Sequence, residues 1–397
     1  MKISEIEVCA VKPVAPPKLD IELPISERDN FLKALNHEKP LWMPNQYRTT
    51  QFAFCKANQD MPRSMKSATD DWFGCQYIFS EKYGTPTPHG IMFDDITEWE
   101  TAVKWPDMDA YVWEKTPNFQ ADPGKVLCTP YGNGIFERMH MFMGFENSLV
   151  ALITEPDACK AFFNAMADYK IEIFNRMADI YDFDFVIYND DWGTAKDTFF
   201  SVDTMKDLLL EPTRRIFEAI HKRSVKVEFH NCGKIDRFIP YIMEELAPDA
   251  LEIQTINDIK HILGEYGDRV MVEYAPNPFF INDKDVTADQ LKAYAREIVD
   301  TYGAHANKGS GVTLNINCND AEVYRTFETE IIEETSPLVQ FLVGWVLPYA
   351  VIFGAGYFLM RSLQKRMGGE NAMSFGKANA KIVGEEKTGV TFDDVAG

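Results

Sequence analysis

The chain of 397 residues is 46% hydrophobic, 13% aromatic and 25% charged, a composition typical of a folded protein and not of a disordered one. Its 40 basic and 61 acidic residues give a net charge of −21, which would repel a phosphate backbone and argues against nucleic acid as a partner. Seven cysteines without a regular spacing, and an N-terminus without an apolar signal segment, lead us to expect the main body in the cytoplasm.

The first third of the chain predicts few regular elements. Residues 1–25 hold four prolines and no helical period, so we expect an extended arm. A helix is predicted to begin at Ser26, which can cap it, and to end before Pro40. Residues 40–144 are weakly periodic and indicate loops and short elements, whereas residues 155–181 carry apolar side chains at the spacing of a long amphipathic helix.

Short apolar strands then alternate with helices. Strands are predicted at 183–188, 225–229, 250–254, 269–274 and 312–317, and helices at 203–222, 234–246, 257–265, 287–302 and 320–333. This alternation is typical of right-handed βαβ units and a parallel sheet. Further strands are plausible earlier in the chain, and no glycine-rich fingerprint follows any strand. The pattern therefore favours an α/β protein with a (β/α)8 TIM barrel, in which the chemistry lies at the carboxyl ends of the strands.

Polar residues follow the first of these strands. Tyr188, Asp190 and Asp191 stand at its end, where the two carboxylates could hold a polar group of a substrate or cap the helix that follows. Glu252 and Glu273 also lie at or near strand ends. We expect Asp191, Glu273 and Asp190 to be catalytic, as proton donors or as a displaceable metal ligand, and Tyr188 and Glu252 to bind substrate.

A second strand end reads FHNCG. Alternate residues of an extended segment share a side, so His230 and Cys232 should point together into the mouth of the barrel, and Gly233 lets the chain turn away. Cys318 stands at the end of the last predicted strand. One imidazole and two thiolates suit zinc, and three protein ligands leave one position open, as in catalytic sites. The alternative is that these are core residues that hold no metal.

Several segments together resemble the uroporphyrinogen decarboxylase superfamily over residues 26–335. They are RDNFLKALNH (28–37), GNGIFER, GFENSL, YNDDWGT, VEFHNCGKI and the final INC. The pattern is similar to the zinc- and corrinoid-dependent methyltransferase branch, whose members carry H-x-C and a distant C as zinc ligands. The resemblance implies zinc at His230, Cys232 and Cys318. It also implies a corrinoid (cobalamin) as methyl carrier, usually on a separate protein, and a small-molecule methyl donor or thiol acceptor that the sequence does not identify.

Two alternatives to a methyltransferase stay open. The first is a decarboxylase of a tetrapyrrole; such enzymes carry an R-Q-A-G-R segment that holds substrate carboxylates. The corresponding stretch here, PLWMPNQYRTTQ, has Arg48 as its single cation, which argues against decarboxylation. The second alternative is a non-catalytic, membrane-tethered fusion product.

The C-terminal part of the chain has a different character. Residues 336–360 are 25 uncharged residues, enough for a transmembrane helix and a single-pass anchor, with a buried helix as the alternative. Together with the polar tail at 361–397 they resemble the second transmembrane segment and linker of FtsH-type AAA proteases, without an ATP-binding or H-E-x-x-H motif. We therefore expect four parts: an extended arm (1–25), a cytoplasmic barrel (26–335), the transmembrane helix (336–360) and the polar tail (361–397). Of the possible origins of this combination, we favour a gene fusion in which the C-terminal segment has no selected function.

Overall fold

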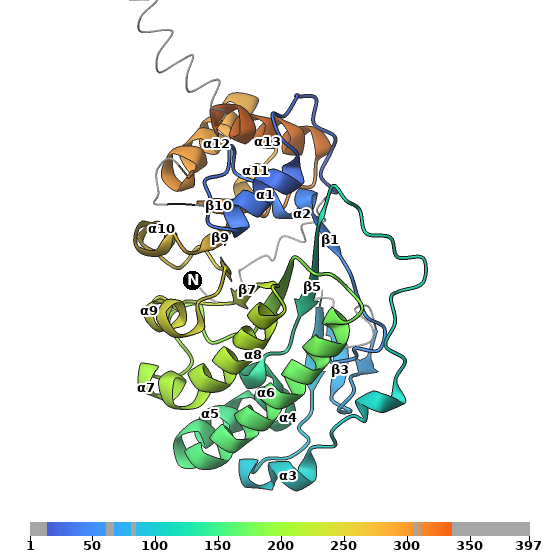
Figure 1. Cartoon of the computed structure of the whole chain (residues 1–397). Coiled ribbons are helices and arrows are strands. Elements are labelled where there is room, and N and C mark those ends of the chain that lie inside the picture. Colours follow the sequence, from blue (N-terminus) through green and yellow to red (C-terminus); the bar gives the residue numbers. More distant parts are fainter. Residues whose placement is uncertain (1–13, 61–66, 81–84, 305–308, 310, 336–397) are drawn as a thin grey trace, which may run out of the picture. The chain divides into compact units, whose positions relative to one another are not determined.

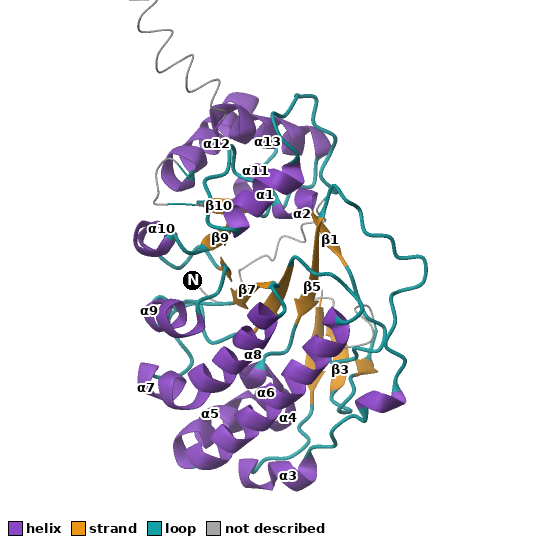
Figure 2. Cartoon of the chain, viewed as in Figure 1, coloured by secondary structure: helices purple, strands orange, loops and turns teal. Residues whose placement is uncertain are grey.

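The computed structural model of the chain describes residues 14–60, 67–80, 85–304, 309 and 311–335 (Figure 1). The chain divides into two compact units, Met1–Pro337 and Leu338–Gly397, and every described residue lies in the first. The centre of this unit is a parallel sheet with the strand order β1-β5-β6-β7-β8-β9-β10, and Figure 2 shows helices around it.

The strands of this sheet are short and buried on both faces, which is why they read as apolar runs in the sequence. They are β1 (Thr50–Phe52), β5 (Val126–Tyr131), β6 (Phe185–Asn189), β7 (Lys226–Asn231), β8 (Ala250–Ile253), β9 (Met271–Tyr274) and β10 (Val312–Leu314). The sheet curls until its edges meet, because Asn45 forms a parallel bridge with Leu314 and the Leu314 N–H donates to the Pro44 carbonyl at 2.7 Å.

The fold is therefore an α/β fold with a curled, TIM-barrel-like parallel sheet. The five strands predicted in the C-terminal half are all present. We predicted eight barrel strands, whereas seven strands form this sheet in the described residues. Where an eighth strand was expected, the single bridge between Asn45 and Leu314 joins the two edges.

The helices lie outside the strands, as the alternation predicted. They are α1 (Glu27–Leu35), α2 (Gln46–Thr49), α3 (Trp99–Ala102), α4 (Ile135–Met143), α5 (Phe145–Thr154), α6 (Pro156–Ala178), α7 (Val202–Thr204), α8 (Leu210–Lys222), α9 (Ile239–Tyr241), α10 (Ile259–Tyr266), α11 (Pro278–Ile281), α12 (Ala288–Tyr302) and α13 (Ala321–Thr335). The predicted cap of α1 is confirmed, since the Ser26 hydroxyl accepts the Asp29 N–H at 3.0 Å.

The region predicted as loops contains a second, antiparallel sheet of β2 (Thr69–Asp70), β3 (Gln76–Ser80) and β4 (Thr85–His89). A buried ion network holds it to the barrel. The fully buried Arg138 of α4 donates to Asp71 at 2.6 Å and to Asp60 at 3.0 Å, and Lys170 of α6 contacts Asp60 as well. Removing one member would leave buried charge without a partner, so the network fixes α4 against this sheet.

The interior of the curled sheet is layered along the strands. Because side chains alternate between faces, the interior positions near the amino ends are apolar and pack with α1 in one cluster. Along the same faces Glu228 is level with Ala250, His230 is level with Glu252 and Glu273 two residues further on, and Cys232 follows the end of β7. The interior of the sheet is thus apolar toward the amino ends of the strands and polar toward their carboxyl ends.

No helix in the described part of the chain is both long and apolar enough to cross a membrane. The predicted transmembrane helix at 336–360 and the polar tail at 361–397 lie outside the described residues, as do residues 1–13 of the predicted arm.

Candidate functional site

The carboxyl ends of β6 and β7 bring three predicted site residues together. Nε2 of His230 lies 3.3 Å from Sγ of Cys232 and 3.7 Å from Oδ1 of Asp191. The same carboxylate oxygen accepts a 2.7 Å hydrogen bond from the Cys232 N–H. One nitrogen, one sulfur and one oxygen thus lie within 4.8 Å of one another on half-buried side chains, an arrangement that could hold a metal ion. The prediction that His230 and Cys232 share a side is confirmed.

The residues between these groups tie the two strand ends together. Asn231 points the other way, where its Nδ2 donates to the Asp190 carbonyl at 2.5 Å and its Oδ1 accepts the Trp192 N–H at 3.1 Å. Gly233 has a φ of +84°, and a Cβ there would lie 2.2 Å from the carbonyl carbon of Gly193. Only glycine allows this turn, so the prediction for Gly233 is confirmed.

Asp190, predicted to be catalytic, instead supports α4. Its carboxylate accepts the N–H groups of Glu137 at 2.9 Å and Phe136 at 3.2 Å. The cap position of that helix is Gly134, where a Cβ would lie 2.2 Å from the Asp190 side chain, so the aspartate supplies the cap that glycine lacks. Burial raises the pKa of Asp190 to about 7 despite these hydrogen bonds.

Tyr188, predicted to bind substrate, is likewise part of the scaffold. Its side chain is fully buried, and its hydroxyl accepts the Ile135 N–H at 3.2 Å in the first turn of α4. Burial holds the pKa of the phenol well above its ordinary value. Tyr188 and Asp190 together therefore fix the start of α4, and neither lies in the group formed by Asp191, His230 and Cys232.

Cys318, predicted as the third metal ligand, is not part of that group either. The last strand ends at Leu314 and not at residue 317, so Cys318 has already left the line of the sheet. Its thiol is buried and lies 3.2 Å from the Asp320 carbonyl in the turn before α13, and its own carbonyl accepts the Val14 N–H at 2.8 Å. Burial raises the pKa of this thiol.

Glu252 and Glu273 belong to a second group, with Glu228. These carboxylates come from adjacent strands, and an oxygen of each lies within 4.8 Å of the other two. Burial and the charges of the neighbouring glutamates hold the pKa of Glu273 well above its ordinary value, and burial with Glu252 raises the pKa of Glu228 to about 8. The predicted substrate-binding residue Glu252 and the predicted catalytic residue Glu273 thus lie beside each other, Glu273 buried and Glu252 half-buried.

Glu252 connects the two groups. Its Oε2 lies 2.8 Å from Nδ1 of His230, although the N–H direction misses the oxygen, so that Nδ1 has no aligned hydrogen bond. Burial opposes protonation of the imidazole, but contacts with Cys232 and Glu252 outweigh it and raise the pKa of His230 well above its ordinary value. The carboxylate on Nδ1 leaves Nε2 to face Cys232 and Asp191.

Two residues of α4 also approach the site, and the sequence did not reveal them. Burial, with the charges of Asp191 and Asp190, raises the pKa of Glu137 to about 8. Burial lowers the pKa of His140 to about 4, against the opposing charge of Asp191. His140 is therefore a neutral imidazole at neutral pH. The spacing of these residues by three on a helix was the available signal, since it places both side chains on one face.

Glu228 and Gln46 were missed as well. Glu228 shares the alternation of His230 and Cys232, and a charged residue inside an apolar strand was the signal for it. Gln46, in α2, donates from Nε2 to Glu228 at 2.9 Å across 182 residues of sequence. No local sequence pattern predicts a contact between residues so far apart in the chain.

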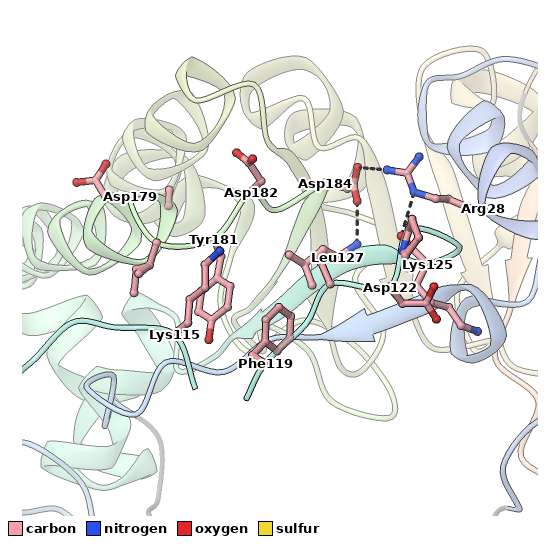
Figure 3. Close-up of a pocket in the computed structure, with 14 residues that line it drawn as sticks. Arg28, Lys115, Phe119, Asp122, Lys125, Leu127, Asp179, Tyr181, Asp182 and Asp184 are labelled. Atoms are coloured by element: carbon pink, nitrogen blue, oxygen red, sulfur yellow. Dashed lines mark hydrogen bonds and ion pairs between the residues drawn. The ribbon is translucent and has the colours of Figure 1, made fainter. Parts of the chain in front are cut away.

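A cavity of about 620 Å³ lies at the opposite, amino-terminal ends of β5 and β6 (Figure 3). Charged residues of both signs line it, and several are already paired. Arg28 donates to Asp184 and to the Lys125 carbonyl, both at 2.9 Å, and the second Asp184 oxygen accepts the Leu127 N–H at 2.8 Å. This end of a barrel usually serves stability, and the cavity is not part of the metal-ligating group.

The family model of uroporphyrinogen decarboxylase (URO-D) matches residues 71–325, more than half of the chain. Curated relatives match over much less. The ATP-dependent zinc metalloprotease FtsH of Clostridium perfringens is 45% identical over 64 residues, 16% of this chain and 9% of the relative. The FtsH protease of Bacillus subtilis is 36% identical over 108 residues, which are 27% of this chain and 16% of the relative. The chain spans less than a fifth of these relatives, and such short matches do not establish the predicted FtsH-like tail.

Proposed function

The chain belongs to the uroporphyrinogen decarboxylase family, and within that family we propose that it is a zinc-dependent methyltransferase. It would move a methyl group between a small substrate or thiol and a corrinoid, the latter expected on a partner protein. The observation that carries the proposal is the grouping of His230, Cys232 and Asp191. Members of this family are generally enzymes, and this group offers the chemistry of a catalytic metal site.

The donor set fits zinc. Imidazole nitrogen, thiolate sulfur and carboxylate oxygen are its usual ligands, and tetrahedral bonds of about 2.0–2.3 Å separate ligand atoms by roughly 3.3–3.6 Å. The separations here are 3.3 Å from His230 to Cys232 and 3.7 Å from His230 to Asp191. We therefore propose Asp191 as the third ligand, in the role that the sequence suggested for Cys318. Three protein ligands leave a fourth position for substrate.

Neighbouring residues hold these ligands in place. Glu252 beside Nδ1 keeps Nε2 of His230 toward the metal position, and the Cys232 N–H fixes the Asp191 carboxylate. When bound, zinc would lower the pKa of a coordinated thiol or polarise a methoxyl oxygen. Glu137 and the neutral His140, on one face of α4, both interact electrostatically with Asp191, and we propose that they hold or pass a proton there.

Decarboxylation of a tetrapyrrole is less well supported. Its substrate carries carboxylates that need free cations, whereas the single cation of the corresponding segment, Arg48, is held by Glu328 through Nε at 2.7 Å and lies 3.4 Å from Glu27. The interior instead presents glutamates, which would repel such a substrate.

The test is zinc analysis of the purified full-length chain together with a methylcobalamin–thiol transfer assay. We expect about one zinc per chain, and loss of both zinc and transfer in Cys232→Ser, because a catalytic site keeps no spare protein ligand. Cys128→Ala is the matched control, since that cysteine is buried in the separate apolar cluster with α1 and should change neither. A wild-type chain without zinc or transfer would instead support the non-catalytic alternative.

A further inference from the structure

The three glutamates of the second group, two of them buried and Glu252 half-buried, have no permanently cationic side chain as a partner among the described residues. Glu228 is fully buried and Glu273 is 5% exposed, yet no lysine or arginine among the described residues forms an ion pair with any of the three. Among the described residues, their hydrogen bonds and ion pairs are with two neutral amides, Gln46 and Asn315, and with the imidazole of His230. Carboxylates this close repel one another strongly unless a proton or a cation lies between them.

Two oxygens beside this group are also buried without any hydrogen-bond partner. They are Oε2 of Glu228 and Oε1 of Gln46, whose side chain is 3% exposed. Nε2 of Gln46 donates to the other oxygen of Glu228 at 2.9 Å, so the amide group that carries Oε1 lies against this carboxylate. Both unpartnered atoms are acceptors. What the group lacks is therefore a positive ion or a donor.

We infer that Glu228, Glu252, Glu273 and Gln46 form a second metal site, which binds a divalent cation that prefers oxygen ligands, of the Mg²⁺, Mn²⁺ and Ca²⁺ class. Every ligand atom in this group is oxygen, in contrast to the nitrogen, sulfur and oxygen of the first group, and hard cations select such sets. The inference does not depend on methyl transfer.

The spacing favours an ion over an organic cation. Metal–oxygen bonds of about 2.1–2.5 Å hold ligand oxygens no more than roughly 5 Å apart, and the glutamate oxygens lie within 4.8 Å of one another. A methylated ammonium ion has methyl groups between its nitrogen and the carboxylates, so the carboxylate oxygens around it would have to lie further apart. Glu252 would then touch both sites, with one oxygen toward the cation and Oε2 toward His230.

The experiment is a titration of the purified, zinc-containing full-length protein with Mn²⁺, with free Mn²⁺ measured by electron paramagnetic resonance. We expect one saturable site per chain. Glu228→Gln and Glu273→Gln keep the side-chain shape and should each weaken it about tenfold or more. Glu297→Gln, on the exposed face of α12, is the control for binding to the acidic surface and should change nothing.

Further readouts separate this site from the zinc site. Cys232→Ser should lose zinc and keep Mn²⁺ binding, while retained zinc in the two glutamine variants shows that they fold. Mn²⁺ should also raise the unfolding temperature of the wild type and not that of Glu273→Gln. Absence of saturable binding, or equal binding in wild type and glutamine variants, would overturn the inference and show that protons neutralise these carboxylates.

Discussion

Acidic side chains lie at both ends of the barrel strands, but their partners differ between the two ends. At the amino ends, Asp184 and Asp249 each precede a strand and accept a backbone N–H from the neighbouring strand, at 2.8 and 2.9 Å, and each also pairs with a cation. At the carboxyl ends, Asp191 lies with His230 and Cys232 in one group, and three glutamates lie together in a second group beside it. The amino-end aspartates are paired with cations, whereas atoms of Glu228 and His230 at the carboxyl end have no hydrogen-bond partner, which is why we place the proposed binding sites there.

The pKa values follow the same division. Hydrogen bonds from His221, Lys226 and the Val227 N–H, with His37 at 3.7 Å, outweigh burial and hold the pKa of Asp249 well below its ordinary value. Burial instead raises the pKa of Glu228 to about 8. Substitutions at the amino end should therefore change stability without changing metal content, and substitutions at the carboxyl end should do the reverse.

The largest effect on stability is expected for Asp249→Asn. This carboxylate is buried among Lys226, His221 and a backbone N–H, and its loss should cost about 3 kcal/mol of unfolding free energy at pH 7. Because its folded pKa is lowered, its contribution is complete above the unfolded pKa of about 3.9 and is lost as the pH falls through the folded value. Urea unfolding from pH 7 down to pH 3 should thus show a constant difference between the two proteins that begins to shrink only below about pH 4.

The control for this substitution is Asp179→Asn, whose exposed side chain pairs with Arg223 at 2.6 Å. An exposed ion pair contributes about 0–1 kcal/mol, so the change should be small at every pH. Zinc content should be normal in both variants. Loss of zinc in Asp249→Asn, in protein that is still folded, would break the proposed division between the ends.

A smaller effect is expected for Arg28→Gln. Arg28 joins α1 to the strand ends through Asp184 and the Lys125 carbonyl, but its side chain is 28% exposed, and Asp184 keeps its bond to the Leu127 N–H. We expect a loss of about 1 kcal/mol in urea unfolding and unchanged zinc and methyl transfer. A defect in transfer at normal stability would instead give the cavity of Figure 3 a functional role.

The parallel sheet could be predicted because strands buried on both faces read as apolar runs between amphipathic helices. The antiparallel sheet could not, since it depends on contacts such as Arg138 to Asp60, 78 residues apart, and on elements too short to show a period. The periodicity of apolar side chains can therefore be recognised in a short stretch of sequence, whereas the partners of buried charged side chains cannot.

The candidate site divides in the same way. The shared side of His230 and Cys232 follows from strand alternation, which is local. Cys318 was misplaced because its strand ends three residues earlier than its apolar pattern suggests. The cap that Asp190 provides could not be predicted, because the helix that it caps lies 54 residues earlier in the chain, where Gly134 leaves the space for it.

The central claim is that zinc is held by His230, Cys232 and Asp191 and not by Cys318. X-ray absorption at the zinc edge, on the full-length protein, tests it most directly, because zinc–sulfur bonds of about 2.3 Å stand apart from zinc–nitrogen and zinc–oxygen bonds of about 2.0–2.2 Å. The account predicts one sulfur per zinc, and no sulfur shell around any metal retained by Cys232→Ser. Two sulfurs per zinc, falling to one in Cys318→Ala, would contradict it.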